Sequence, residues 1–345
     1  MRRLLLSMLG AASLLVASTI SAQASIPAAY QLSGIQHIYQ GWNNCGPATL
    51  TMGLSFFTDE ELSQNPAAAW LKPNPEDKNV SPWQIIEYVN NQLNSGVQAL
   101  LRQGGSVELL KTLIANDFPV LVEAGFDPPN DDQGWMGHYL LVSGYDDAQQ
   151  LFTTQDSFEG PNYTYDYAYF DDYWRHFNRL YIPLYTPDRE AELMAILGED
   201  ADEIANWNHA LATARAEATA NPNDPFNWFN LGTNFVALQD FASASVAFDQ
   251  ARSVGGGLPF RMLWYQFGPY EAYLNIGRYG DVIALATAAL NDGGGQYVEE
   301  TFYYAALARD GMGERDRAIL NLDGTIAFNP NFTPALEARE AILNR

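Results

Sequence analysis

Residues 39–48 read YQGWNNCGPA and contain the only cysteine of the chain, Cys45. Gly46 and Pro47 follow it, and residues 48–57 have the composition of a helix. Proline is well tolerated in the first turn of a helix, because the N–H that it lacks would have no partner there. The stretch therefore predicts a helix that opens at Cys45, and a helix N-terminus favours an anion such as a thiolate.

A cysteine that attacks carbonyl groups needs a lowered pKa, a histidine partner and hydrogen-bond donors for the oxyanion. Gln40 lies five residues before Cys45 and offers a side-chain donor. His138 begins one predicted strand, and Asp156 ends the next one. If these strands are antiparallel neighbours joined by the turn at 144–150, Asp156 lies beside His138 and could fix the tautomer of its ring.

The run at 39–48 resembles the Q-x(4)-C-G-P-A nucleophile box of the C39-like cysteine peptidases. Residues 137–146, GHYLLVSGYD, resemble the histidine strand of that family, and residues 154–157, TQDS, resemble its aspartate segment. The family more often has proline after the aspartate, so Ser157 is a departure. Residues 107–122 resemble the helix and strand that precede the histidine in the family.

The resemblance extends over residues 33–185 and implies an α+β fold of the papain-like type. It also implies hydrolysis of peptide bonds by a triad of Cys45, His138 and Asp156, with Gln40 as the oxyanion donor. The family members that mature bacteriocins are fused to membrane transporters and cut leader peptides after paired glycines. This sequence contains no transporter, so we do not expect that substrate.

The pattern of predicted elements agrees with an α+β domain without reference to any family. Helices are expected first, and short strands rich in β-branched and aromatic residues follow, an order typical of α+β folds rather than of doubly wound sheets. Serine and proline at 81–82 are typical of a helix start. The expected helices are 48–57, 81–93 and 107–115, and the expected strands are 119–123, 138–144, 151–155 and 179–184.

Residues 1–24 have the three parts of a secretory signal peptide. A basic start at Arg2 and Arg3 precedes an apolar run at 4–20, and residues 22–24 form an A-x-A cleavage site. We expect cleavage near Ala24, export to the extracellular or cell-envelope side, and no stable membrane span afterwards. A lone cysteine in an oxidising compartment is a liability unless it is buried or used, which draws attention to Cys45.

After residue 187 the composition shifts to alanine, leucine and other helix formers, and an internal period appears. Residues 228–251 follow the W-x2-L-G-x2-Y … A-x3-F … A pattern of a tetratricopeptide repeat, with phenylalanine in the tyrosine position. We therefore predict all-α tetratricopeptide-like (TPR-like) repeats at 224–345, with a capping helix at 331–343. Residues 187–223 are a helical linker or a degenerate first repeat.

The repeats begin near residues 191, 225, 263 and 299. Pro269 falls inside the first helix of the third unit, where proline should kink or end the helix. An ordinary helical bundle is the simpler alternative. The aromatic residues at 264–273 could fill the core between hairpins, as aromatic residues at helical spacing usually do. Some could instead line a groove or pack against the first domain.

Composition limits the partners. The 345 residues carry 18 Lys and Arg against 41 Asp and Glu, a net charge of −23, so the chain repels the phosphate backbone of nucleic acids. His37, His176 and His209 lack metal-ligand spacing and are interpreted as structural, so we expect no metal and no cofactor. The acidic stretches at 127–132 and 166–172 are expected to be solvated loops.

Three functions remain open at this point. The first is a secreted cysteine peptidase that acts on a peptide or protein substrate, with the repeats docking that substrate or a protein partner. The second is a non-catalytic adaptor in which the repeats bind and the papain-like domain is only a scaffold. The third is a papain-like amidase or transpeptidase that acts on cell-wall amides, although such enzymes usually orient the catalytic histidine with a second histidine. Fold alone does not decide among these functions.

Overall fold

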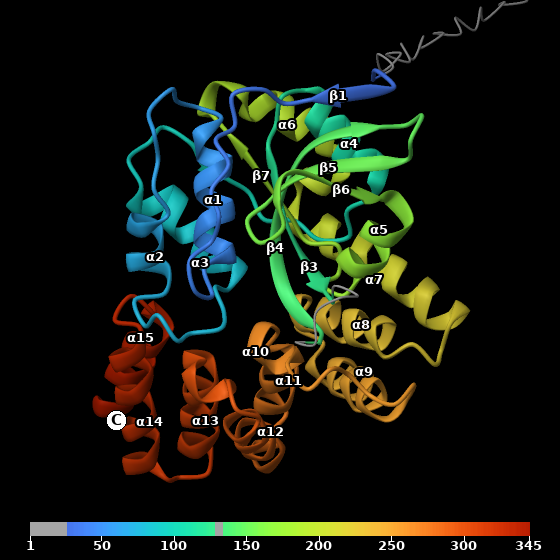
Figure 1. Ribbon diagram of the computed structural model, residues 1–345. Helices are drawn as coiled ribbons and strands as arrows, with labels where there is room; N and C mark the ends of the chain where they lie inside the picture. Colours follow the sequence, from blue (N-terminus) through green and yellow to red (C-terminus); the bar gives the residue numbers. More distant parts are fainter. Residues whose placement is uncertain (1–25, 128–133) are drawn as a thin grey trace, which may run out of the picture.

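The computed structural model describes residues 26–127 and 134–345. The predicted signal peptide at 1–24 and most of the acidic stretch at 127–132 lie outside the described residues. The described chain has two parts, which we call the sheet domain (26–185) and the helical region (186–345). Figure 1 shows residues 225–345 of the helical region as an arc of helices below the sheet domain.

The sheet domain is built on an antiparallel sheet with the strand order β2-β7-β3-β4-β5-β6, and β1 pairs with the end of β4. β4 is the longest strand and lies between β3 and β5, which places its residues at the centre of the domain. The strands are β1 (Ala29–Gln31), β2 (Gln98–Ala99), β3 (Val120–Phe126), β4 (Met136–Asp146), β5 (Leu151–Asp156), β6 (Gly160–Asp166) and β7 (Tyr181–Tyr185).

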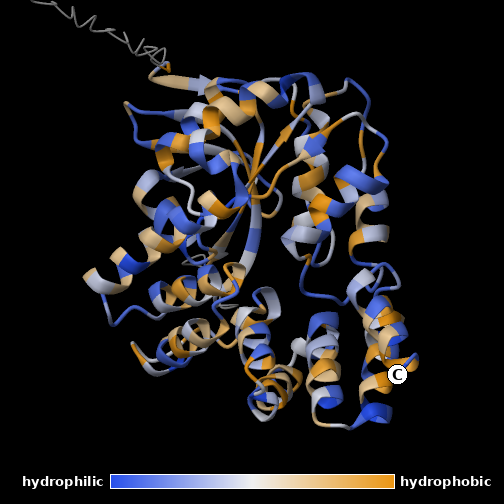
Figure 2. Ribbon diagram, turned by 180° about the vertical axis from the view of Figure 1, so that it is seen from behind, coloured by the Kyte–Doolittle hydropathy of each residue, from blue (hydrophilic) through white to orange (hydrophobic). Residues whose placement is uncertain are grey.

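Two hydrophobic cores lie on the two faces of this sheet. Neighbouring β4 residues enter opposite cores, Leu140 one and Leu141 the other, because strand side chains alternate between faces. Figure 2 shows hydrophobic stretches within the central strands and a mixture of hydrophobic and hydrophilic residues in the helices. The core that contains Leu141 is covered by α1 (Cys45–Ser55), α2 (Asn65–Leu71), α3 (Pro82–Glu87) and the π-helical turn η1 (Tyr88–Gln92). The core that contains Leu140 is covered by α4 (Val107–Ala115), α5 (Tyr167–Arg175) and α6 (Glu190–Leu197).

The predicted elements of this domain are present, with small shifts at their ends. The helix expected at 107–115 has those bounds, and Ser81 caps α3 through a capping box with Gln84. The stretch at 166–172 is not the expected acidic loop. Asp166 accepts a hydrogen bond from the backbone N–H of Tyr169 and caps α5, whose aromatic side chains Phe170 and Trp174 are buried against the sheet. Burial of an aromatic face here outweighs the acidic composition.

The helical region consists mainly of helices that follow one another as neighbours. The helical stretch that begins near residue 263 is interrupted as predicted, because Pro269 lies in the first turn of a new helix rather than inside a long one. The helices are α7 (Glu203–Ala220), α8 (Pro225–Ala237), α9 (Phe241–Ser253), α10 (Met262–Tyr265), α11 (Gly268–Asn275), α12 (Tyr279–Asn291), α13 (Glu299–Gly311), α14 (Arg315–Phe328) and α15 (Thr333–Leu343), with short 3-10 turns η2 (Pro187–Arg189), η3 (Gly198–Ala201) and η4 (Gly295–Tyr297). No helix within the described residues is long and apolar enough to cross a membrane.

Buried polar side chains join the two parts. The amide of Asn206 on α7 donates to the carbonyl of Gln103 and accepts from its N–H, so one side chain closes a two-way bridge. Asn329, at the end of α14, donates to the carbonyl of Leu71. Because an unpaired buried polar group costs stability, these satisfied contacts specify how the two parts fit together.

Candidate active site

Cys45 is the first residue of α1, and packing against the sheet fixes the position of that helix. Thr49 on α1 donates a hydrogen bond to the carbonyl of Tyr139 on β4, at 3.0 Å. A Cβ atom at Gly53 would lie 2.8 Å from the side chain of Leu184, so only glycine lets the helix approach the sheet this closely. The N-terminus of α1, and with it Cys45, is therefore held beside β4.

His138 and Asp156 lie next to each other on the neighbouring strands β4 and β5. The Nε2 atom of His138 is 2.9 Å from Oδ1 of Asp156, and both side chains are buried. The contact between His138 and Asp156 that the sequence predicts is therefore present. Since Asp156 engages Nε2, the other ring nitrogen, Nδ1, is left for the cysteine.

The carboxylate of Asp156 is fixed by donors of its own. Oδ1 accepts from the backbone N–H groups of Phe158 and Glu159, and Oδ2 accepts from the hydroxyl of Tyr165 at 2.6 Å. Burial by itself would raise the pKa of Asp156, but the charge of His138 and these donors lower it to about 2. The aspartate stays ionised and can hold His138 in one orientation.

Cys45 and His138 stabilise each other's charged forms. Burial alone would raise the pKa of the Cys45 thiol. The hydrogen bond to His138, its charge and the backbone N–H groups of Tyr139 and Gly46 outweigh burial, so this pKa is lowered. Burial would lower the pKa of His138, but Asp156 and Cys45 raise it to about 10. The arrangement favours a thiolate paired with an imidazolium, the reactive form of a cysteine nucleophile.

Gln40 is oriented by Ser157, the residue that departs from the family pattern. The backbone N–H of Gln40 donates to the carbonyl of Ser157, and the Ser157 hydroxyl donates to the side-chain Oε1 of Gln40 at 2.8 Å. The side-chain carbonyl of Gln40 is therefore already engaged. Its amide group, which can only donate, is left for another acceptor.

Sequence reasoning missed two residues that hold the loop between Gln40 and Cys45. The Oε1 atom of Gln64 accepts from the N–H of Gly41 and from Asn44, while its Nε2 donates to the carbonyl of Tyr39. The ammonium group of Lys72, a buried side chain, donates to the carbonyl of Trp42. Neither residue stands in a motif, so no sequence signal indicated this bracing role.

The helical region reaches the start of the histidine strand. Tyr265 of α10 packs on Gly137, where a Cβ atom would lie 2.9 Å from the tyrosine ring. Trp135, two residues earlier, lies against Tyr265 and Phe226 of the same region. Because Gly137 directly precedes His138, side chains of the helical region contact the start of the strand that carries this histidine.

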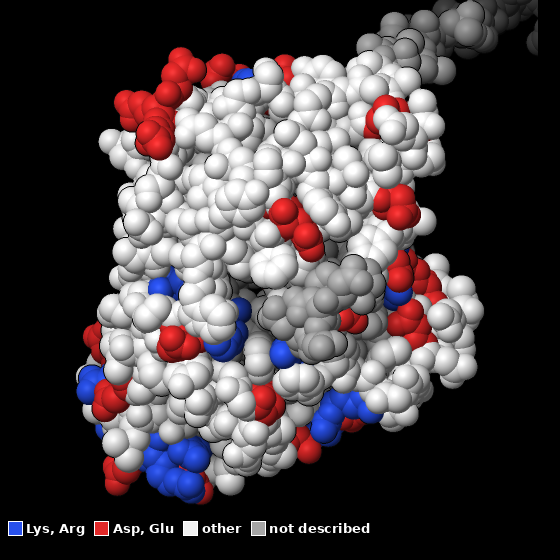
Figure 3. Space-filling view, viewed as in Figure 1, with Lys and Arg blue, Asp and Glu red and all other residues white. Residues whose placement is uncertain are grey.

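Three large aromatic side chains near the Gln40 loop are exposed. Tyr39 is 62% exposed, Trp42 68% and Phe158 46%. Tyr39 and Trp42 flank Gln40 in the chain, and Phe158 follows the serine that orients it. Large exposed apolar groups gathered in one place commonly mark a binding surface. Figure 3 shows that the face above the helical region carries Asp and Glu but few Lys or Arg.

His176 and His209 make their contacts away from this group. His176 is buried and accepts from the indole of Trp135, and burial lowers its pKa to about 3, so it is neutral. His209 is exposed and lies 3.1 Å from Asp200. His37 lies closer to the group, since burial lowers its pKa while Gln155 and the charge of Asp156 act to raise it, and its ring packs edge-on against Tyr39. Among residues 26–127 and 134–345, no group of three or more His, Cys, Asp or Glu side chains could hold a metal ion.

Residues 23–182 match the model of the Peptidase_C39-like family. No curated protein is significantly similar in sequence. Among solved structures, a C39-like candidate peptidase from Bacillus anthracis aligns at 15% identity and a TM-score of 0.35, over 46% of this chain and 98% of its own. MamA RS-1, as a double mutant, aligns at 17% identity and a TM-score of 0.35, over 44% of this chain and 82% of its own. The C39-like family model therefore matches the sheet domain of this chain, and a helical region follows that domain.

Proposed function

We propose that the protein is an exported cysteine peptidase that hydrolyses peptide bonds. The observation that carries the proposal is the line of three side chains, with Cys45 at a helix N-terminus, His138 beside it and Asp156 bound to the far ring nitrogen of the histidine. The match of residues 23–182 to the C39-like family model supports the same chemistry. The contacts of these side chains support the role that the proposal gives to each residue.

In the first half of the reaction, the Sγ atom of Cys45 attacks the carbonyl carbon of the scissile bond. The amide group of Gln40 and the N–H groups at the start of α1 donate to the oxyanion that forms. Nδ1 of His138 gives its proton to the leaving amine as the C–N bond breaks. A thioester on Cys45 remains, and Asp156 keeps the neutral imidazole in the correct tautomer.

In the second half, water replaces the amine. His138, now neutral, takes a proton from the water at Nδ1 while the oxygen attacks the thioester carbon. The C–S bond breaks, the new carboxylic acid leaves, and the thiolate–imidazolium pair is restored. No metal or organic cofactor is needed at any step.

The helical region would serve to dock the substrate or a partner. We interpret residues 224–345 as TPR-like repeats, on the motif at 228–251 and on helix starts at 225, 262 and 299 that follow the predicted period. Stacked helical hairpins of this kind form concave surfaces that hold extended segments. The contact of Tyr265 with Gly137 supports a docking surface that lies close to the catalytic groups.

Export remains a proposal that rests on residues 1–24 alone. In an oxidising compartment, a reactive lone thiol persists best when it is largely covered. Half-buried Cys45 beneath the Gln40 loop suits that requirement. Appearance of the protein outside the cytoplasm with a new N-terminus after Ala24 would support the proposal, and cytoplasmic retention of the full chain would contradict it.

The direct test is cleavage of a proteome-derived peptide library, with mass spectrometry of the new termini. The wild-type chain should produce new termini that are absent with Cys45→Ala at equal concentration. Fast labelling of Cys45 by an active-site electrophile without any peptide cleavage would instead favour an amidase or transpeptidase. Slow labelling together with no cleavage would favour the adaptor.

A further inference from the structure

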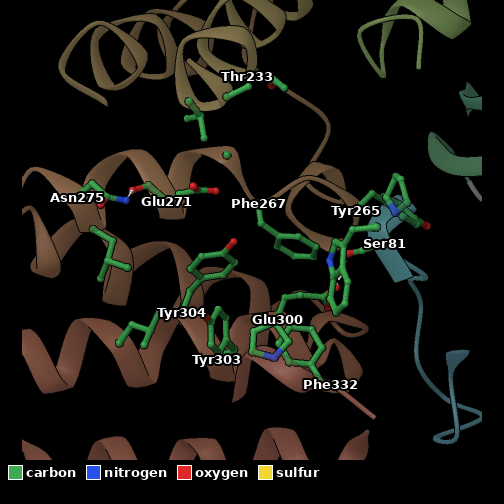
Figure 4. Close-up of a pocket in the computed structure, with 18 of the residues that line it drawn as sticks. Ser81, Thr233, Tyr265, Phe267, Glu271, Asn275, Glu300, Tyr303, Tyr304 and Phe332 are labelled. Carbon is green, nitrogen blue, oxygen red and sulfur yellow. Dashed lines mark hydrogen bonds between the residues drawn. The ribbon is translucent and has the colours of Figure 1, made fainter. Parts of the chain in front are cut away.

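A hollow of about 580 Å³ lies between the helical region and the sheet domain. One wall comes from the start of α3, and the other comes from the inner faces of α8, α11 and α13. Figure 4 shows side chains from these successive helices pointing into one elongated space. A space that crosses several helices in sequence suits an extended chain better than a compact small molecule.

Aromatic rings form much of the lining. The rings of Phe267 and Tyr304 stack with centroids 6.0 Å apart, and Tyr303 lies 5.3 Å from Phe332. Trp83 of the sheet domain packs edge-on against Phe332 and completes the surface. Faces of such rings attract cationic groups as well as apolar ones.

The charged side chains of the lining are carboxyls only. Glu271 and Glu300 line the hollow, and no Lys or Arg of the described chain does so. Glu300 is engaged on its Oε1 by Ser81 and Asn79. Glu271 forms no ion pair with any described residue, and burial raises its pKa. A carboxyl kept partly from water without a cation is complementary to a ligand that brings one.

The hollow adjoins the candidate active site on both sides. Ser81, in its lining, directly follows Val80, whose side chain lies 3.2 Å from where a Cβ atom of Gly46 would be. Tyr265, also in its lining, packs on Gly137. One lining residue, Tyr265, therefore contacts the glycine before His138, and another, Ser81, is the chain neighbour of a residue that contacts the glycine after Cys45.

We propose that this hollow binds a segment of the substrate that carries a lysine or arginine side chain, with the cation at Glu271 and the aliphatic stem on the aromatic wall. The inference rests on the proposed peptidase function and names the class of substrate for it. A second copy of this chain is a poor occupant, because two molecules of net charge −23 repel each other. A basic segment is drawn toward the acidic protein.

The test is binding to the full chain with Cys45→Ser, which removes turnover. Two fluorescein-labelled decapeptides serve as probes. They are identical except that two lysines in one are glutamines in the other, and anisotropy gives their dissociation constants at low salt. The lysine peptide should bind about tenfold or more tightly, and Glu271→Gln should remove most of that difference. Glu340→Gln, an exposed carboxyl on α15, is the matched control and should change little.

Equal affinity for the two peptides, or a lysine preference that survives Glu271→Gln, overturns the inference. Melting curves of each variant separate a lost contact from a lost fold. Cleavage of the glutamine peptide by the wild-type chain without any lysine preference in binding leaves the peptidase proposal standing and rejects only the basic segment. Binding of the lysine peptide with no cleavage of any peptide supports the site and contradicts the peptidase.

Discussion

The two sides of the candidate active site are held by different parts of the molecule. The Cys45 side is held within the sheet domain, since Gln64 and Lys72 brace its loop and Thr49 ties α1 to β4. The start of the histidine strand is packed by the helical region, where Tyr265 covers Gly137. Figure 1 shows α10 against the lower end of β4. Cys45 is thus fixed locally, while the position of His138 depends on residues more than a hundred positions further along the chain.

The largest expected effect is the loss of activity when either side of the candidate site, the cysteine or the histidine, is removed. Cys45→Ala and His138→Ala should each lower kcat/KM for a cleaved peptide by roughly 10⁴-fold or more, and the double variant should lose little beyond the worse single one. Asp156→Asn should lose much less than Cys45→Ala, because the thiol and ring remain and only their orientation suffers. Steady-state kinetics on one peptide compares them. Multiplicative losses in the double variant would show that the residues do not act together.

A smaller loss should follow on the nucleophile side. Gln40→Ala should slow turnover by roughly 10²-fold or more, the usual cost of one oxyanion donor, with KM changed far less. Ser157→Ala, which removes only the group that orients the amide of Gln40, should have the same signature at smaller size. Unchanged turnover in Gln40→Ala, with an intact fold, would make Gln40 structural.

On the histidine side, the expected effect is smaller still. Tyr265→Ala should lower kcat on the order of tenfold, because a small displacement of His138 weakens proton transfer, and should shift the pH dependence of kcat/KM. Tyr265→Phe keeps the ring and should restore the profile. Phe260→Ala removes a nearby exposed ring and serves as the control. An unaltered pH profile in Tyr265→Ala would show that the helical region does not position the base.

The smallest effect concerns the junction of the two parts rather than the chemistry. Asp77 of the sheet domain lies beside Glu299 and Glu300 of α13, and all three side chains are buried. Lys72 is the nearby cation. The neutral side chains around the three carboxyls are Asn79, Ser81, Gln84, Tyr139 and Asn329. Burial raises the pKa of Asp77 to about 6. Burial and the charge of Glu299 raise that of Glu300 to about 8.

The folded state therefore binds protons that the unfolded chain releases. For these carboxyls, the stabilisation is complete below the unfolded pKa values of 3.8 for Asp77 and 4.5 for Glu300, and is lost as pH rises through about 6 to 8. Tm should fall between pH 5.5 and 8.5, and Glu300→Gln should reduce that fall by at least about 3 °C, whereas Glu340→Gln should not. Equal pH dependence of Tm in wild type and Glu300→Gln would show that Glu300 does not cause the loss of stability at high pH.

The sequence predicted the parts of the fold that local patterns control. The helix at 107–115, the strand pair that carries His138 and Asp156, and the break before Pro269 all follow from period, turn residues and proline chemistry. The helix at 167–175 was missed because acidic composition was weighted above its aromatic spacing.

The candidate site also has a part that local sequence patterns predict and a part that they do not. The four motif residues could be named from their order along the chain, and the structure brings His138 and Asp156 into contact. The roles of Gln64 and Ser157 could not be predicted from the sequence. Gln64 accepts from the N–H of Gly41, 23 positions away, and Ser157 donates to Gln40, 117 positions away. The same holds for Tyr265, whose neighbour on β4 is set by how the two parts pack.

The central claim is that Cys45 is a thiolate stabilised by His138, and the rate of alkylation of Cys45 by iodoacetamide against pH tests it most directly. In the wild-type chain the rate should rise at a lower pH than an ordinary thiol requires, because His138 lowers the pKa of Cys45 despite its burial. In His138→Ala the rate should follow an ionisation at a higher pH. A wild-type profile that rises around the ordinary thiol pKa of about 8.5, and that His138→Ala leaves unchanged, would contradict the account.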